Sequence, residues 1–110
     1  MTEIRYEPGR YRIRITGHAG AGEKGRDIVC AGVSALAFAL LRQAGGEEAA
    51  VTVDPAAALI DVRCAPADEA AALRCRAMLD TVAGGLRLIA ETWPDYVRFE
   101  TISGKEEACV

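Results

Sequence analysis

The only histidine of the chain and one of its four cysteines lie close together in the sequence, at His18 and Cys30. A cysteine beside an imidazole can act as a nucleophile, because the imidazole takes the thiol proton and leaves a reactive thiolate. Asp27 is a good N-cap for the apolar segment that begins at Ile28, so we expect Cys30 to be the third residue of a helix. The first turn of a helix carries partial positive charge and unpaired N–H groups, which favour a thiolate and could bind an oxyanion.

Each of these residues also has an ordinary structural interpretation. A single helical cysteine is more often a small buried hydrophobic side chain than a nucleophile, and a single histidine at a strand end is usually a polar edge residue. Asp27 either caps the helix or orients the imidazole as a third catalytic member, and it cannot fully do both. Ser34 lies one helical turn after Cys30, where it could bond the thiolate, position substrate or bond a backbone carbonyl.

The elements that must position this pair can be predicted from the pattern of apolar residues. Apolar and charged residues alternate over 3–7 and 10–15, with a Pro8-Gly9 turn between them, which predicts a hairpin that ends just before His18. The helix after Asp27 is apolar on nearly every side and stops at Gly45-Gly46. We expect a helix of this kind to pack against the sheet and also against a partner subunit.

The second half of the chain repeats this order of elements. A hairpin is predicted from 51–53 and 59–64, a second helix begins after Asp68 and ends at Pro94, and a last strand covers 96–102. The apolar stripe of that helix consists of Cys75, Leu79, Val82, Leu86, Ile89 and Trp93. The order ββαββαβ predicts one α+β domain over residues 1–110, with two helices in a second layer on a mixed, largely antiparallel sheet.

Composition excludes several classes of protein. The chain is 51% hydrophobic and carries a net charge of -3, so it is neither disordered by composition nor drawn to nucleic acid by an overall basic field. It has no apolar stretch long enough for a membrane span or a signal peptide, and we expect a cytoplasmic protein. The cysteines lack metal-binding spacing, so no metal is expected; Cys64 and Cys75 are predicted to be core and Cys109 an exposed tail residue.

Two further features are assigned structural interpretations. The segment from Gly20 to Gly25 matches the dinucleotide-binding pattern G-x-G-x-x-G, but that site needs a buried parallel strand before it, whereas the strand here has an arginine-lined face. We therefore reject a dinucleotide site. Arg10, Arg12 and Arg14 could meet RNA or a peptide, and more often such a row is a solvated sheet face whose arginines pair with glutamates on neighbouring strands.

The stretch from Gly17 to Ser34 resembles the bacterial ribosomal-processing cysteine protease family Prp. The family pattern is Gly-His-Ala, a short glycine-containing loop, then Asp-hydrophobic-Val-Cys-Ala and a serine one turn later. This sequence matches it without a gap at Gly17, His18, Ala19, Gly25, Asp27, Ile28, Val29, Cys30, Ala31 and Ser34. The length of the chain and its order of elements also fit the family.

The resemblance implies a cysteine endoprotease with no cofactor, in which Cys30 is the nucleophile and His18 the general base. Asp27 and Ser34 fall on the family's supporting positions, and Gly17 and Ala19 flank the histidine. The family's substrate is the hydrophobic N-terminal extension of the large-subunit ribosomal protein numbered twenty-seven, with aromatic residues before the cut. The family also forms homodimers. No membrane or direct nucleic-acid partner is expected.

One departure from the family concerns the loop. Many relatives carry a polar residue and an aromatic residue after Gly-His-Ala, whereas this chain has Gly20 and Ala21. A loop with Gly20, Gly22 and Gly25 is predicted to be mobile when empty and to close over a bound peptide. Two alternative functions are kept: a non-catalytic binding module of the same fold that acts in ribosome assembly, and a different cysteine enzyme such as an acyltransferase or thioesterase.

Overall fold

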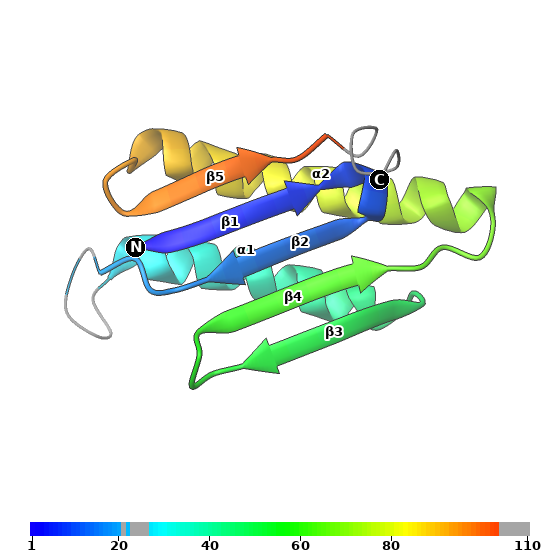
Figure 1. Ribbon diagram of the computed structural model, residues 1–110, viewed down its shortest axis with the longest axis horizontal. Coiled ribbons are helices and arrows are strands. Elements are labelled where there is room, and N and C mark those ends of the chain that lie inside the picture. The colour runs from blue at the N-terminus through cyan, green and yellow to red at the C-terminus, as the bar shows by residue number, and fades with distance from the viewer. Residues whose placement is uncertain (21, 23–26, 104–110) are drawn as a thin grey trace.

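The computed structural model describes residues 1–20, 22 and 27–103 of the chain (Figure 1). Its elements in chain order are β1 (Thr2–Glu7), the 3-10 helix η1 (Pro8–Arg10), β2 (Arg12–Thr16), α1 (Ile28–Ala44), β3 (Ala49–Asp54), β4 (Leu59–Cys64), α2 (Glu69–Thr92) and β5 (Val97–Thr101). The predicted order of strands and helices is confirmed.

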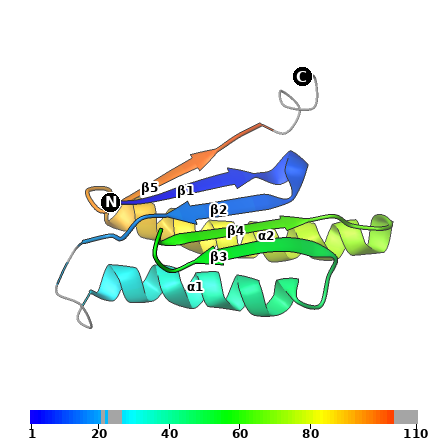
Figure 2. The same cartoon turned by 60° about the horizontal axis from the view of Figure 1, so that its bottom comes forward.

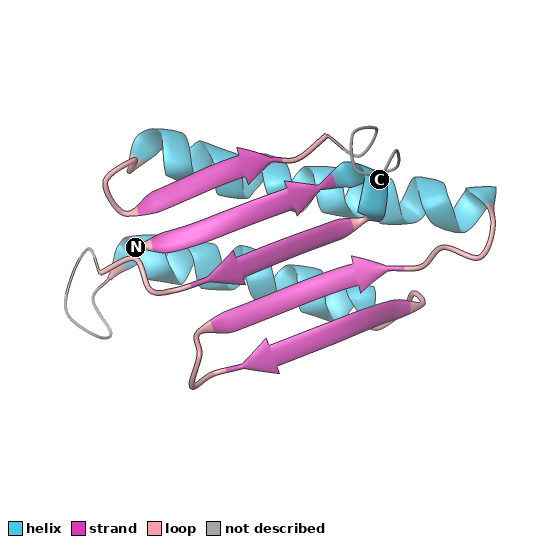
Figure 3. Cartoon of the chain, in the orientation of Figure 1, coloured by secondary structure: helices cyan, strands magenta, loops and turns pink. Residues whose placement is uncertain are grey.

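The strands form one sheet in the order β3-β4-β2-β1-β5. All neighbouring pairs are antiparallel except β1 and β5, which run parallel with Thr2 opposite Val97. Both helices cover one face of the sheet and leave the other face open (Figures 2 and 3). The predicted two-layer α+β fold with a mixed, largely antiparallel sheet is therefore confirmed.

The alternation of residues in the strands separates a buried face from a charged one. In β1, Ile4 and Tyr6 are buried under the helices, while Glu3 and Arg5 point to the open face. On that face Arg12 donates to Asp61 across the β2–β4 pair, with 2.9 Å between Nε and Oδ1. The predicted solvated face with cross-strand ion pairs is thus present.

The two helices bury apolar stripes against the sheet and against each other. α1 buries Val29, Val33, Ala37, Leu40 and Ala44. The predicted stripe of α2 is confirmed at Cys75, Leu79, Val82 and Leu86, and Ile89 and Trp93 pack at its margin. Cys64 at the end of β4 and Cys75 are both buried, as predicted. Burial and the adjacent Cys75 raise the pKa of the Cys64 thiol to about 12, so this thiol stays protonated at neutral pH.

One predicted turn is different in the structure. The predicted hairpin of β1 and β2 is present, but the segment that joins them is a single 3-10 turn, and Arg10 belongs to this turn and not to a strand. Tyr11 follows with φ 53°, outside β2, a left-handed conformation that a bulky residue rarely adopts. Its backbone is held there because its N–H donates to the Pro8 carbonyl and its own carbonyl accepts from Cys64.

Candidate active site

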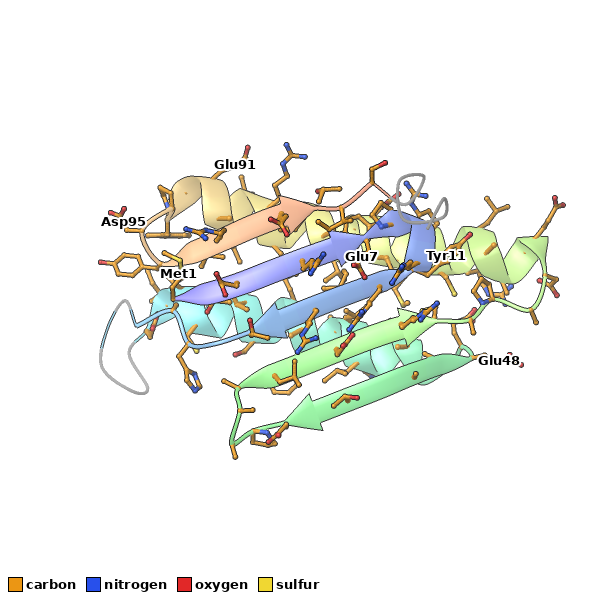
Figure 4. All side chains as sticks on the ribbon, viewed as in Figure 1. Met1, Glu7, Tyr11, Glu48, Glu91 and Asp95 are labelled. Atoms are coloured by element: carbon orange, nitrogen blue, oxygen red, sulfur yellow. The ribbon has the colours of Figure 1, made fainter. Side chains whose placement is uncertain are left out.

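His18 lies just beyond the end of β2. The residue before it, Gly17, has φ +84°, and a Cβ at that position would overlap the carbonyl oxygen of Met1. Glycine is therefore required there both by the backbone conformation and by the close approach of the N-terminal residue. Figure 4 shows Met1 beside the end of β2 and Tyr11 toward the opposite end of that strand. The turn at Gly17 takes the chain out of the sheet and leaves the His18 side chain exposed.

Cys30 is the third residue of α1, as predicted. The Asp27 side chain accepts a hydrogen bond from the Cys30 backbone N–H, at 2.9 Å from Oδ1, and thereby caps the helix. The interpretation of Asp27 as an N-cap is confirmed. This bond also uses one of the first-turn donors, so the N–H of Cys30 is not available for an oxyanion while the cap is in place.

His18 and Cys30 line the same two cavities. One, of about 320 Å³, lies between α1 and the adjacent ends of β2, β3 and β4. The other, of about 590 Å³, lies on the side of the loop and is also lined by Gly20, Gly22 and Asp27. Ser34 lines both cavities with His18 and Cys30. The structure thus brings the predicted histidine, cysteine and serine to one place, beside the ends of the strands where β2 finishes.

The cavity under the sheet has a mostly apolar wall that sequence reasoning did not identify. The helix contributes residues at successive turns after Cys30, and the β3–β4 hairpin contributes the facing wall; the apolar members are Ile15, Val33, Ala37, Phe38, Val53, Pro55, Ala58, Leu59 and Ile60. Asp54, at the end of β3, is the carboxylate in this lining, and its Oδ1 accepts from the backbone N–H groups of Ala56 and Ala57. The arrangement fits an apolar side chain held close to Cys30.

Phe38 and Val53 show why this wall is open. Phe38 is 62% exposed and Val53 is 48% exposed, although both are large hydrophobic residues on elements that cover the core. The spacing of Cys30, Ser34 and Phe38 along one helix face was the available signal for this wall. The pattern of residues 51–53 predicted the strand β3. It did not predict that α1 leaves the helix-facing side of β3 partly uncovered.

The remaining predicted site residues have mixed outcomes. Ala19 is 4% exposed and belongs to the core, so its place is structural packing next to His18. Gly20 has φ +70° and open space around it. Gly25 and Cys109 lie outside the described residues, as does most of the loop from 21 to 26, so its mobility stays a prediction.

The residues that the structure describes contain neither a cluster of metal-ligating side chains nor a helix fit to span a membrane. Within residues 1–20, 22 and 27–103, no group of three histidine, cysteine or acidic side chains is arranged to hold a metal ion. None of the helices in these ranges combines the length and hydrophobicity that a bilayer span requires.

The chain matches the model of a known protein family. The family model of cysteine protease Prp matches residues 1–98. The chain belongs to the cysteine protease Prp family. The match covers both helices, all of β1 to β4 and the start of β5, and therefore all the described residues around His18 and Cys30. The predicted resemblance to this family is confirmed. A search of curated proteins finds no match.

Solved structures, two of them of a Prp protease, have the same fold. The chain is similar to the essential ribosomal processing protease Prp from S. aureus in complex with a covalently linked product peptide, with 26% identity and a TM-score of 0.79, covering 93% of this chain and 100% of that one. The same S. aureus protease with a substrate peptide gives 23% identity and a TM-score of 0.75, with the same coverage. SMU.848 from Streptococcus mutans gives 23% identity and 0.71, covering 93% of this chain and 92% of that one.

Proposed function

We propose that this Prp-family chain is an endopeptidase that removes the hydrophobic N-terminal extension of the large-subunit ribosomal protein numbered twenty-seven, using Cys30 as nucleophile and His18 as general base. The observation that carries the proposal is the cavity that His18 and Cys30 share, with an apolar wall beside the thiol. A related protease has been solved with a covalently linked product peptide, which supports a covalent route here.

The proposed reaction has two halves. His18 takes the proton from the Cys30 thiol, and the thiolate attacks the carbonyl carbon of the scissile peptide bond. The tetrahedral intermediate collapses when the imidazolium gives its proton to the leaving amine, which breaks the C–N bond and leaves a thioester on Cys30. Water then attacks this thioester as His18 accepts its proton, and the proton returns to the departing thiolate. The helix N-terminus at Cys30 stabilises the thiolate before its attack and again as it departs from the acyl group.

The apolar wall supports a hydrophobic substrate. A peptide that places an apolar side chain between Val33 and Leu59 removes that side chain from water, at about 25 cal/mol for each Å² of buried apolar surface. Binding energy of this kind holds the adjacent carbonyl against Cys30, which is how a remote side chain contributes to the chemical step. Ser34, one turn from Cys30 in both cavities, is placed to contact the bound backbone or the thiolate.

Exposed residues of α1 support a homodimer as part of this proposal. Ile28 is 71% exposed and Phe38 is 62% exposed, and the small residues Ala31 and Ala35 lie between them on the exposed surface. An apolar helix face of this kind is covered in many proteins by a second copy. We propose a cytoplasmic homodimer with no metal or organic cofactor. Analytical ultracentrifugation tests the dimer, and a monomer at micromolar concentration would contradict it.

The test of the activity uses a synthetic peptide that spans the ribosomal-protein extension from the same genome. The peptide is incubated with wild type, Cys30→Ala and His18→Ala, and the product masses are read. We expect one cut by wild type and none by either variant. A folded wild type that cuts nothing would favour the non-catalytic binding module, and hydrolysis of a thioester but not of the peptide would favour a thioesterase.

A further inference from the structure

Gly17, the residue that directs His18 into the cavity, is held by hydrogen bonds on both of its peptide planes. Its N–H donates to the Ala58 carbonyl in the β3–β4 turn at 2.9 Å. Its carbonyl oxygen accepts from the hydroxyl of Thr2, with 3.3 Å between the two oxygens. Neither bond belongs to the regular ladder of β1 and β2, whose register ends at the pair Glu3 and Thr16.

The second bond acts directly on His18, because the Gly17 carbonyl belongs to the peptide unit that joins Gly17 to His18. A peptide unit is planar, so fixing its oxygen also fixes the direction in which it delivers the Cα of the next residue. Glycine at φ +84° has few steric limits of its own. Without the Thr2 bond this plane could rotate, and the imidazole would be spread over several positions relative to Cys30.

Thr2 is itself placed firmly enough for this role. It is 2% exposed, although it is polar and is the first residue of β1. Its backbone N–H donates to the Tyr96 carbonyl at 2.9 Å, which ties the start of β1 to the segment before β5. Its branched side chain has restricted χ1 freedom, so its hydroxyl is held in one direction. Thr2 also lines the cavity that contains His18 and Cys30.

We propose that Thr2 is a positioning residue for His18, acting through the carbonyl of Gly17. This inference rests on the proposed function, because it assumes that His18 moves protons for Cys30. The Thr2 hydroxyl orients the one peptide plane that carries the base, and it makes no contact with the reacting atoms. Thr2 therefore should affect the chemical step more than substrate binding.

The experiment compares Thr2→Val, which keeps the shape and removes the hydroxyl, with Thr2→Ser, which keeps the hydroxyl. Thr16→Val is the matched control. Thr16 precedes Gly17 in the sequence, and its hydroxyl also donates to a strand carbonyl, that of Glu3. Each variant is assayed for kcat and KM on the ribosomal-extension peptide, and its folding is checked by thermal melting. If Thr2→Val does not fold, the effect of the hydroxyl is measured by comparing kcat of Thr2→Ala with kcat of Thr2→Ser.

We expect Thr2→Val to lower kcat by about five- to tenfold, the effect of one lost hydrogen bond, with KM changed less than about twofold. Thr2→Ser and Thr16→Val should keep the wild-type kcat. A wild-type kcat in Thr2→Val overturns the proposal, and so does a raised KM with unchanged kcat, which would make Thr2 a substrate contact. Failure of the proposed function is distinguishable, because wild type itself would then leave the peptide uncut, and His18 would need no positioning.

Discussion

Asp27 and Asp68 cap the two helices with the same kind of bond. Comparing variants at the two positions distinguishes a capping role of Asp27 from a catalytic one. The Asp27 carboxylate accepts from Cys30 N–H at 2.9 Å, and the Asp68 carboxylate accepts from Ala71 N–H at 2.8 Å. Asp27 is half-buried beside the cavity, whereas Asp68 is exposed and lies on the other helix. Replacing either by alanine removes one cap bond, but only the first change disturbs the turn that carries the thiol.

The expected loss of stability is about 1 kcal/mol for Asp68→Ala and about 1.5 kcal/mol for Asp27→Ala, because a half-buried N–H left without a partner costs more than an exposed one. For a chain of this size such losses lower the melting temperature by about 4–6 °C. Asp27→Asn should keep the stability within about 0.5 kcal/mol of wild type, since an amide oxygen accepts the same bond. Urea unfolding of wild type, these three variants and the control Asp68→Asn gives these free energies directly.

The same proteins are then alkylated with iodoacetamide at neutral pH, and the modified cysteine is located by peptide mass. Asp27→Ala should change the rate at Cys30, because its helical turn frays, whereas Asp68→Ala should leave that rate unchanged. The cap interpretation of Asp27 fails if Asp27→Asn loses as much stability as Asp27→Ala while Asp68→Asn keeps the stability of wild type. In that case the charge and not the cap bond would be what Asp27 supplies, and the orienting role would regain support.

Three further predictions can be tested on the same material. Gly17→Ala combines a positive φ with overlap onto the Met1 carbonyl, so it should destabilise the protein by about 2 kcal/mol or more and abolish cleavage, measured by urea unfolding and the peptide assay. Partial burial raises the pKa of Asp80, but hydrogen bonds from Tyr6 and a neighbouring arginine outweigh it and hold this pKa below its usual value. The stability that Asp80 contributes is therefore present at neutral pH and is lost as pH falls below about 4. Asp80→Asn should therefore lower stability by about 1 kcal/mol at pH 7, a figure reduced for its solvent exposure, and the difference from wild type should vanish in acid; an equal difference at pH 7 and pH 3 would contradict this. Cys64, buried and with a raised pKa, should resist alkylation in the native protein at pH 8 and react only after unfolding; native labelling as fast as in urea would show that its surroundings open.

Much of the fold could be predicted because each strand and helix carries its own local signal. The alternation in β1 and β2 and the stripe of α2 reflect one-sided burial, which leaves a period in the sequence. The cap at Asp27 was also predictable, because a cap depends only on residues within one turn. Tyr11 was not, since its left-handed backbone is fixed by bonds to Pro8 and Cys64, and Cys64 is far away in the sequence.

The candidate site was only partly predictable for the same reason. His18 and Cys30 could be paired because a strand end and the next helix start commonly meet at one edge of a sheet. The facing wall of the cavity required knowing that the β3–β4 hairpin lies opposite α1 there, which is a matter of tertiary packing. Thr2 gave no signal at all, because its proposed role comes from a bond to Gly17, which follows another strand and is far from Thr2 in the sequence.

The parallel pairing of β1 with β5 has a consequence for the order in which the chain acquires its structure. Residues 1–64 contain His18, Cys30 and both walls of the cavity, so they leave the translating ribosome well before α2 and β5. Contacts between residues so distant in sequence form late, because a long loop must close first. Tyr96, which anchors Thr2, is among the last residues to arrive. A nascent chain therefore carries the side chains of the proposed site before Tyr96 arrives to anchor Thr2, so the proposed activity should appear only after α2 and β5 have formed.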